Sequence, residues 1–93
     1  MNATSNVFAI QIVAPVFITA PNGSLVSGTN TFTFGPAIAE GGNALLVNGV
    51  QHGSGHYLFP LGPLMYTLNL LGNYYFWNGN GWMQVAKPAG APV

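Results

Sequence analysis

The chain has 93 residues, a formal net charge of zero, no cysteine, and only two charged side chains, Glu40 and Lys87. A domain of this size has a small core, and without cysteine it has no disulfide or thiolate metal site to supplement it. Binding to nucleic acid or to an anionic membrane surface requires clustered Lys or Arg, so the sequence predicts neither partner.

The shortage of charge also predicts association. Charged residues make up 2% of the chain, against about 25% in an ordinary soluble domain. A net charge near zero promotes contact between molecules. One interpretation is a neutral monomer in which Asn and Gly replace charge. We favour the other, that the chain belongs to an assembly in which charges at contacts would only be desolvated.

The first part of the chain reads as an arm followed by a strand. Residues 1–6 are polar and are predicted to form an N-terminal arm. Residues 7–13 alternate with the period of a β-strand, Pro15 interrupts that pattern, and 16–20 continue it.

A hairpin and a second strand are expected next. "APNGS" at 20–24 predicts a turn, because Asn-Gly tolerates positive φ, and 24–27 would then pair with the strand before the turn. Residues 29–35 show the clearest alternation, and Phe32 and Phe34 are predicted to face the core.

The middle of the chain is expected to contain strands separated by loops. Residues 35–43 are predicted to form a loop with one helical turn starting at Pro36. Residues 44–50 form a short strand in this scheme, 51–63 an irregular loop rich in Gly and Pro, and 64–71 another strand.

A last hairpin at 73–86 precedes a Pro/Gly tail at 87–93 that is predicted to have no partner within the chain. We therefore expect a single all-β domain over residues 7–86 between two extended arms. Six to eight short strands would form a small antiparallel β-sandwich or barrel, and the sequence does not choose between them.

The last hairpin, "YYFWNGNGWMQV" at 74–85, carries aromatic side chains on both of its faces. A loop at 78–81 would place Trp77 opposite Trp82, and Tyr75 opposite Gln84. The face with Phe76 and Met83 is then the expected core side, although a tighter turn would change this register. Exposed aromatic area marks interaction sites, unless the loop at 51–63 covers it. Together with polar turn residues and tail prolines, the predicted contact residues are Tyr75, Trp77, Trp82, Gln84, Asn78, Asn80, Pro88 and Pro92.

This aromatic run, its Asn/Gly turn and the following Trp-x-x-Val resemble hairpins near the ends of phage tail-fibre and other virion structural proteins. The resemblance covers residues 73–86. It implies a small virion component, such as a capsid-decoration (cement) or fibre-associated protein.

Signals for chemistry are few. His52 and His56 are spaced to share a metal on a helix, and with Glu40 they could form a ligand set, but the intervening "GSG" disfavours a helix. Loop histidines bonded to backbone are the preferred interpretation. A hydrolytic acid–base pair of the carboxylate type needs two carboxylates and the chain has one, so we expect no enzyme and no cofactor.

The sequence therefore predicts a structural subunit that binds copies of itself, or a shell or filament protein, through uncharged contacts. Strand addition along an unpaired sheet edge is the expected mode, and a homo-oligomer in a virion the expected setting. An extracellular filament subunit or adhesin is one alternative. A carbohydrate-binding module that uses the Trp77 and Trp82 face is the other.

Overall fold

The computed structural model describes residues 16–39 and 41–93, and these residues form nine β-strands and no helix. The strands are β2 (Ile18–Thr19), β3 (Ser24–Ser27), β4 (Asn30–Ala37), β5 (Asn43–Val47), β6 (Val50–Gly55), β7 (Tyr57–Leu61), β8 (Leu64–Leu68), β9 (Tyr74–Trp77) and β10 (Trp82–Val85). The prediction of an all-β fold is confirmed. The predicted arm at 1–6 and strand at 7–13 lie outside the described residues. No helical membrane span occurs in the described part of the chain.

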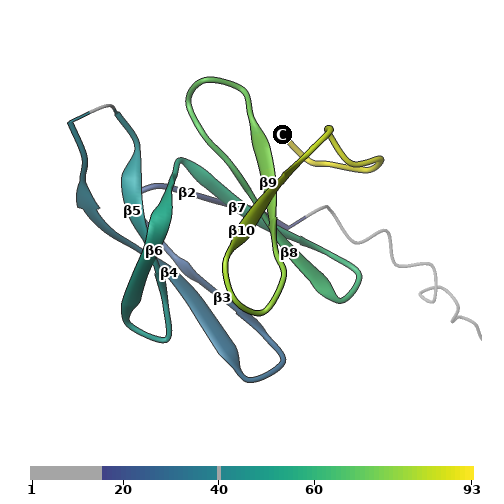
Figure 1. The fold of residues 1–93 in the computed structure, drawn as a ribbon, viewed down its shortest axis with the longest axis horizontal. Coiled ribbons are helices and arrows are strands. Elements are labelled where there is room, and N and C mark those ends of the chain that lie inside the picture. Colours follow the sequence, from purple (N-terminus) through teal and green to yellow (C-terminus); the bar gives the residue numbers. More distant parts are fainter. Residues whose placement is uncertain (1–15, 40) are drawn as a thin grey trace, which may run out of the picture.

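The strands form two antiparallel sheets that face each other (Figure 1). One sheet has the order β10-β9-β8-β7-β2, and the other has the order β3-β4-β5-β6. Between residues 16–39 and 41–93 no strand pair joins one sheet to the other, so the arrangement is sandwich-like and not a closed barrel.

The core lies between the sheets and draws on both of them. Its fully buried cluster consists of Phe32, Leu45, Val47, Leu58 and Met65. The inward orientation predicted for Phe32 is confirmed, and Phe34 packs against the same cluster. Burial of side chains from both sheets holds them together, because no backbone ladder does so in the described residues.

The predicted hairpin around residues 20–24 is wrong in its pairing, although the turn exists. Asn22 N donates to Thr19 O over 3.0 Å, but β2 pairs with β7 and β3 pairs with β4. The turn therefore carries the chain from one sheet to the other. The β3–β4 loop contains only two residues, Gly28 and Thr29. Because closing so short a loop costs little entropy, β3 pairs with β4, the strand that follows it in the sequence.

The segment at 51–63 is not an irregular loop, because β6 and β7 occupy most of it. This difference raises the number of strands above the predicted six to eight. Gly53 and Gly55 break the alternation of side chains on which a strand prediction depends. At Gly55 an added Cβ would overlap Thr67 Oγ1 and lie 3.3 Å from Leu45 Cδ1, so the glycine lets β6 approach the facing sheet. The helical turn expected after Pro36 is also absent, since β4 continues to Ala37.

Candidate functional site

The β9–β10 hairpin has the predicted register. Trp77 lies opposite Trp82, and Tyr75 lies opposite Gln84. Asn78 fixes the loop, because its Oδ1 accepts hydrogen bonds from Asn80 N at 2.8 Å and Gly81 N at 2.9 Å. The Asx turn explains why four loop residues, and not two, connect these strands.

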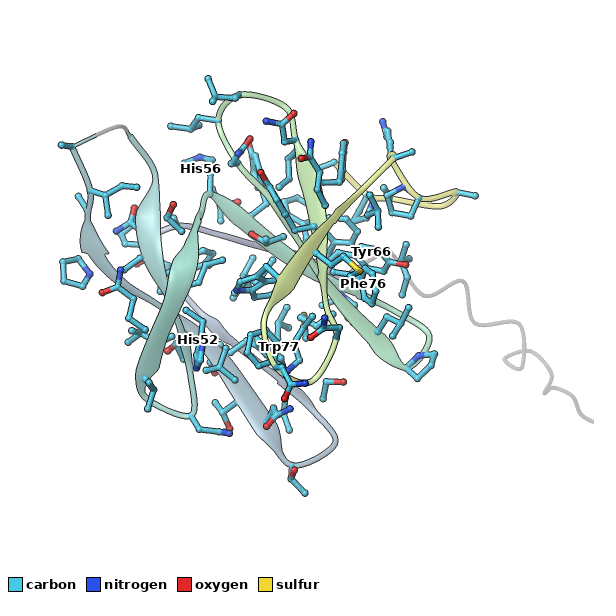
Figure 2. All side chains as sticks on the ribbon, in the orientation of Figure 1. His52, His56, Tyr66, Phe76 and Trp77 are labelled. Atoms are coloured by element: carbon cyan, nitrogen blue, oxygen red, sulfur yellow. The ribbon has the colours of Figure 1, made fainter. Side chains whose placement is uncertain are left out.

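The assignment of the two hairpin faces is wrong. Trp77 and Trp82 were expected to be exposed, but both pack against the core cluster. Their ring centroids lie 6.0 Å and 5.8 Å from that of Phe32 in the facing sheet. Figure 2 shows Trp77 beside His52 between the sheets, with Tyr66 and Phe76 on the opposite side of their strands.

The polar atom of Trp82 finds its partner inside the protein. Trp82 Nε1 donates to the carbonyl oxygen of His52 over 2.8 Å, and the Trp77 and Trp82 rings meet edge to face at 5.3 Å. The assignment of Trp82 to the exposed face overlooked this carbonyl on β6. Because the bond removes the penalty of burying the Trp82 N–H, the large area of this indole favours the core. Trp77 Nε1 is also buried but has no hydrogen-bond partner among the described residues.

The outer face of the five-stranded sheet carries the aromatic side chains that remain. We call Phe59, Tyr66, Phe76 and Met83 the outer row, because strand pairing places them side by side across β7, β8, β9 and β10. Phe59 and Tyr66 stack at 5.5 Å, and Tyr66 and Phe76 are 6.4 Å apart. Phe59 is fully buried, whereas Met83 is 51% exposed. Exposure therefore increases toward the β10 edge.

The C-terminal tail lies against this outer face. The prediction that it has no partner within the chain is therefore wrong. Tyr74 Oη donates to Val93 O over 2.8 Å, and Gly90 lies next to Leu61. Pro88 and Pro92 are both half-buried. Tyr74 packs edge to face with Phe59, so the tail and the outer row share one surface.

The other predicted contact residues are divided between two environments. Gln84, Asn78 and Asn80 are exposed, at the edge strand and in the hairpin turn. Tyr75 is half-buried on the inner face and lines a groove with Trp82. Their role as an interface stays a prediction. Sequence reasoning missed Met83 and Leu71, which are 51% and 85% exposed; the "NLLGN" turn was the available signal for Leu71.

The two histidines have different aromatic neighbours. The His52 ring lies 5.0 Å from Trp77, and the His56 ring lies 4.6 Å from Tyr57. Within the described residues no group of three metal-ligating side chains occurs, and Glu40 lies outside them. The geometry therefore gives no support to a shared metal.

Within residues 16–39 and 41–93, the edge strand β10 is the sheet edge most open to a further strand. β2 has only two residues, and β6 pairs irregularly with β5. β3, like β10, is in continuous register with its neighbour and contains neither charge nor proline, but its last residue Ser27 bonds to the β7–β8 turn over 3.5 Å. Edges with these properties accept further strands.

Comparison with protein-family models, with curated proteins and with solved structures finds no match for this chain. The functional conclusion therefore depends on the surface and the composition of the molecule.

Proposed function

We propose that the chain is a structural subunit of a large protein assembly, a virion component of the decoration (cement) or minor-capsid type. It binds copies of itself or a shell protein through apolar, uncharged contacts. One observation carries the proposal: large apolar side chains are exposed on a surface whose only described charge is Lys87. They are Val16, Phe17, Val26, Val50, Leu64, Leu70, Leu71 and Met83.

Contact with another molecule removes this surface from water at a gain of about 25 cal/mol per Å². A surface with ions would lose part of that gain to desolvation of the charges. The composition and the exposure thus favour the same outcome, which is burial against other protein.

The β10 edge supplies the directional part of the contact. No strand of the described residues pairs with its outer side, so its backbone groups there can pair with an incoming strand, and Met83 extends the outer row toward the strand that is added. Hydrogen bonds along the edge define the register, and the outer row adds apolar area beside them.

Met83→Lys tests this mode. A lysine on an open edge strand opposes strand addition, and its charge would be desolvated in the contact. We expect self-association of the purified chain, measured by sedimentation velocity, to weaken on the order of tenfold or more. The matched control is Val26→Lys on β3, where the side chain is 68% exposed on the other sheet; there we expect little change.

The outcomes are distinct. A wild-type chain that stays monomeric at high concentration contradicts the assembly function itself. Loss of association in Val26→Lys but not in Met83→Lys would show that the contact involves the four-stranded sheet and not the β10 edge. Mass spectrometry of purified virions tests the location, and detection of the chain only in extracellular filaments would favour the filament alternative.

A further inference from the structure

A groove lies between the two sheets, on the side where β6 passes over the ends of β8, β9 and β10. It has a volume of about 250 Å³ and is lined by Gly53, Ser54, Thr67, Asn69, Tyr75 and Trp82. A second hollow of about 190 Å³ shares Ser54 and Asn69 with it and continues toward Leu70 and Leu71. Leu70 and Leu71 belong to the exposed apolar surface of the proposed assembly, whereas the six residues that line the first groove do not.

The aromatic wall of this groove is held in place. The Trp82 indole is fixed by its 2.8 Å hydrogen bond to His52 O and by packing against Phe32. Gly53 provides the room, since an added Cβ would lie 3.2 Å from Trp82 Cδ1. A ring that is already ordered loses little entropy when a ligand stacks on it.

Hydrogen-bonding groups occupy the rest of the lining. The Asn69 Oδ1 atom accepts from Leu71 N at 3.0 Å and Asn73 N at 2.9 Å, so the nitrogen of the same carboxamide is the part that can donate to a ligand. The Thr67 hydroxyl donates to Tyr57 O over 2.8 Å and is buried, so Thr67 shapes the floor of the groove and does not bond to a ligand. The Tyr75 hydroxyl both donates and accepts.

None of the lining residues has an acidic, basic or histidine side chain. An ionic ligand would lose its hydration here without gaining a counter-charge. A neutral saccharide matches the lining better, because its C–H face stacks on aromatic rings and its hydroxyls pair with amide and phenol groups. We propose that this groove binds a neutral saccharide. This site differs from the exposed Trp77 and Trp82 face that the sequence suggested.

Tryptophan fluorescence tests the proposal in any oligomeric state. Trp77→Phe leaves Trp82 as the single reporter, and glucose, galactose, mannose and N-acetylglucosamine are the probes. We expect a saturable change with at least one of them. Tyr75→Phe removes one hydroxyl and should weaken that binding about tenfold. Tyr66→Phe, which makes the same change on the outer face, should leave it unaltered.

Two further measurements complete the test. The wild-type chain is titrated in parallel, so a folding defect in Trp77→Phe does not decide the result. Glucuronate should bind at least about tenfold more weakly than glucose, since its carboxylate meets no cation. The proposal is overturned by the absence of a saturable change with all four sugars, by an equal response in Trp82→Phe, or by equal binding of glucuronate.

Discussion

At the scale of single residues, the glycines of β6 determine how closely the two sheets approach. Gly55 is buried, and a side chain there would overlap the Thr67 hydroxyl, which is itself buried and bonded to Tyr57 O. Thr67 is thus held between a strand of its own sheet and the backbone of the facing one.

Gly55→Ala should therefore lower the free energy of unfolding by about 1–3 kcal/mol, the usual cost of overpacking a well-filled core. Urea denaturation followed by tryptophan fluorescence measures the change. Gly81→Ala is the control, because no atom lies within 4 Å of the added Cβ and its φ is not left-handed; we expect it to be neutral or to stabilise by about 0.4–1 kcal/mol. Equal destabilisation by both substitutions would contradict the packing argument.

Asn48 determines the β5–β6 turn by its backbone and its side chain together. Its φ of 52° precedes a φ of 82° at Gly49, the pattern of a type I′ turn. The side chain accepts from Thr31 N and donates to Asn30 Oδ1, each over 2.9 Å, and so ties this turn to the β3–β4 hairpin.

Two substitutions separate these contributions. Asn48→Gly keeps the left-handed backbone but loses the side-chain hydrogen bonds, and should lower the free energy of unfolding by about 1 kcal/mol. Asn48→Ala adds backbone strain to that loss and should lower it by about 2–3 kcal/mol. Urea denaturation measures both changes. If alanine proves no worse than glycine, the positive φ contributes nothing to the specification of this turn.

At the scale of elements, the C-terminal tail acts as a partial cover for the outer face. Among the described residues, the side-chain hydrogen bond that anchors the tail is the one from Tyr74 Oη to Val93 O. Tyr74→Phe should therefore release the tail and lower the free energy of unfolding by about 0.5–1.5 kcal/mol. Amide hydrogen exchange in residues 86–93, read by mass spectrometry, should become faster. Tyr66→Phe keeps its ring on the same face and is the control. An unchanged exchange rate in Tyr74→Phe would show that apolar contacts alone hold the tail.

The elements also show what the sequence could and could not specify. The register of the last hairpin is local, since it depends on Asn78 and the strands beside it, and it was predicted correctly. The direction of its faces is not local. It depends on Phe32 and on the His52 carbonyl, which belong to the other sheet. Alternation within β9 and β10 cannot reveal which side that sheet occupies.

The same distinction explains the outcome for β6 and β7. The backbone hydrogen bonds of β6 and β7 are made with β5 and β8, respectively. Gly53 and Gly55, however, remove the alternation of side chains that would predict a strand from the sequence. The glycines are required by Trp82 and Thr67, which lie across the core. The candidate groove was unpredictable for the same reason, because its walls come from both sheets.

At the scale of the whole molecule, the near absence of charge has a measurable consequence for association. The Debye length falls from about 10 Å at 0.1 M salt to about 3 Å at 1 M, which weakens contacts made by ion pairs. This chain has one positive and one negative side chain, so its contacts have almost nothing to screen. Apolar contacts respond in the opposite direction, because sulfate and similar salts strengthen burial.

We therefore expect the association constant, from sedimentation equilibrium, to change less than about threefold between roughly 0.1 M and 1 M sodium chloride. It should rise when sodium sulfate replaces chloride at equal ionic strength. Met83→Lys provides the internal contrast: the lysine adds like charge to each copy, so the association that remains should increase as salt screens the repulsion. Dissociation of the wild-type oligomer in 1 M chloride would mean that ion pairs hold it together, and each copy has only two charged side chains to form them. That result would contradict assembly through apolar contact.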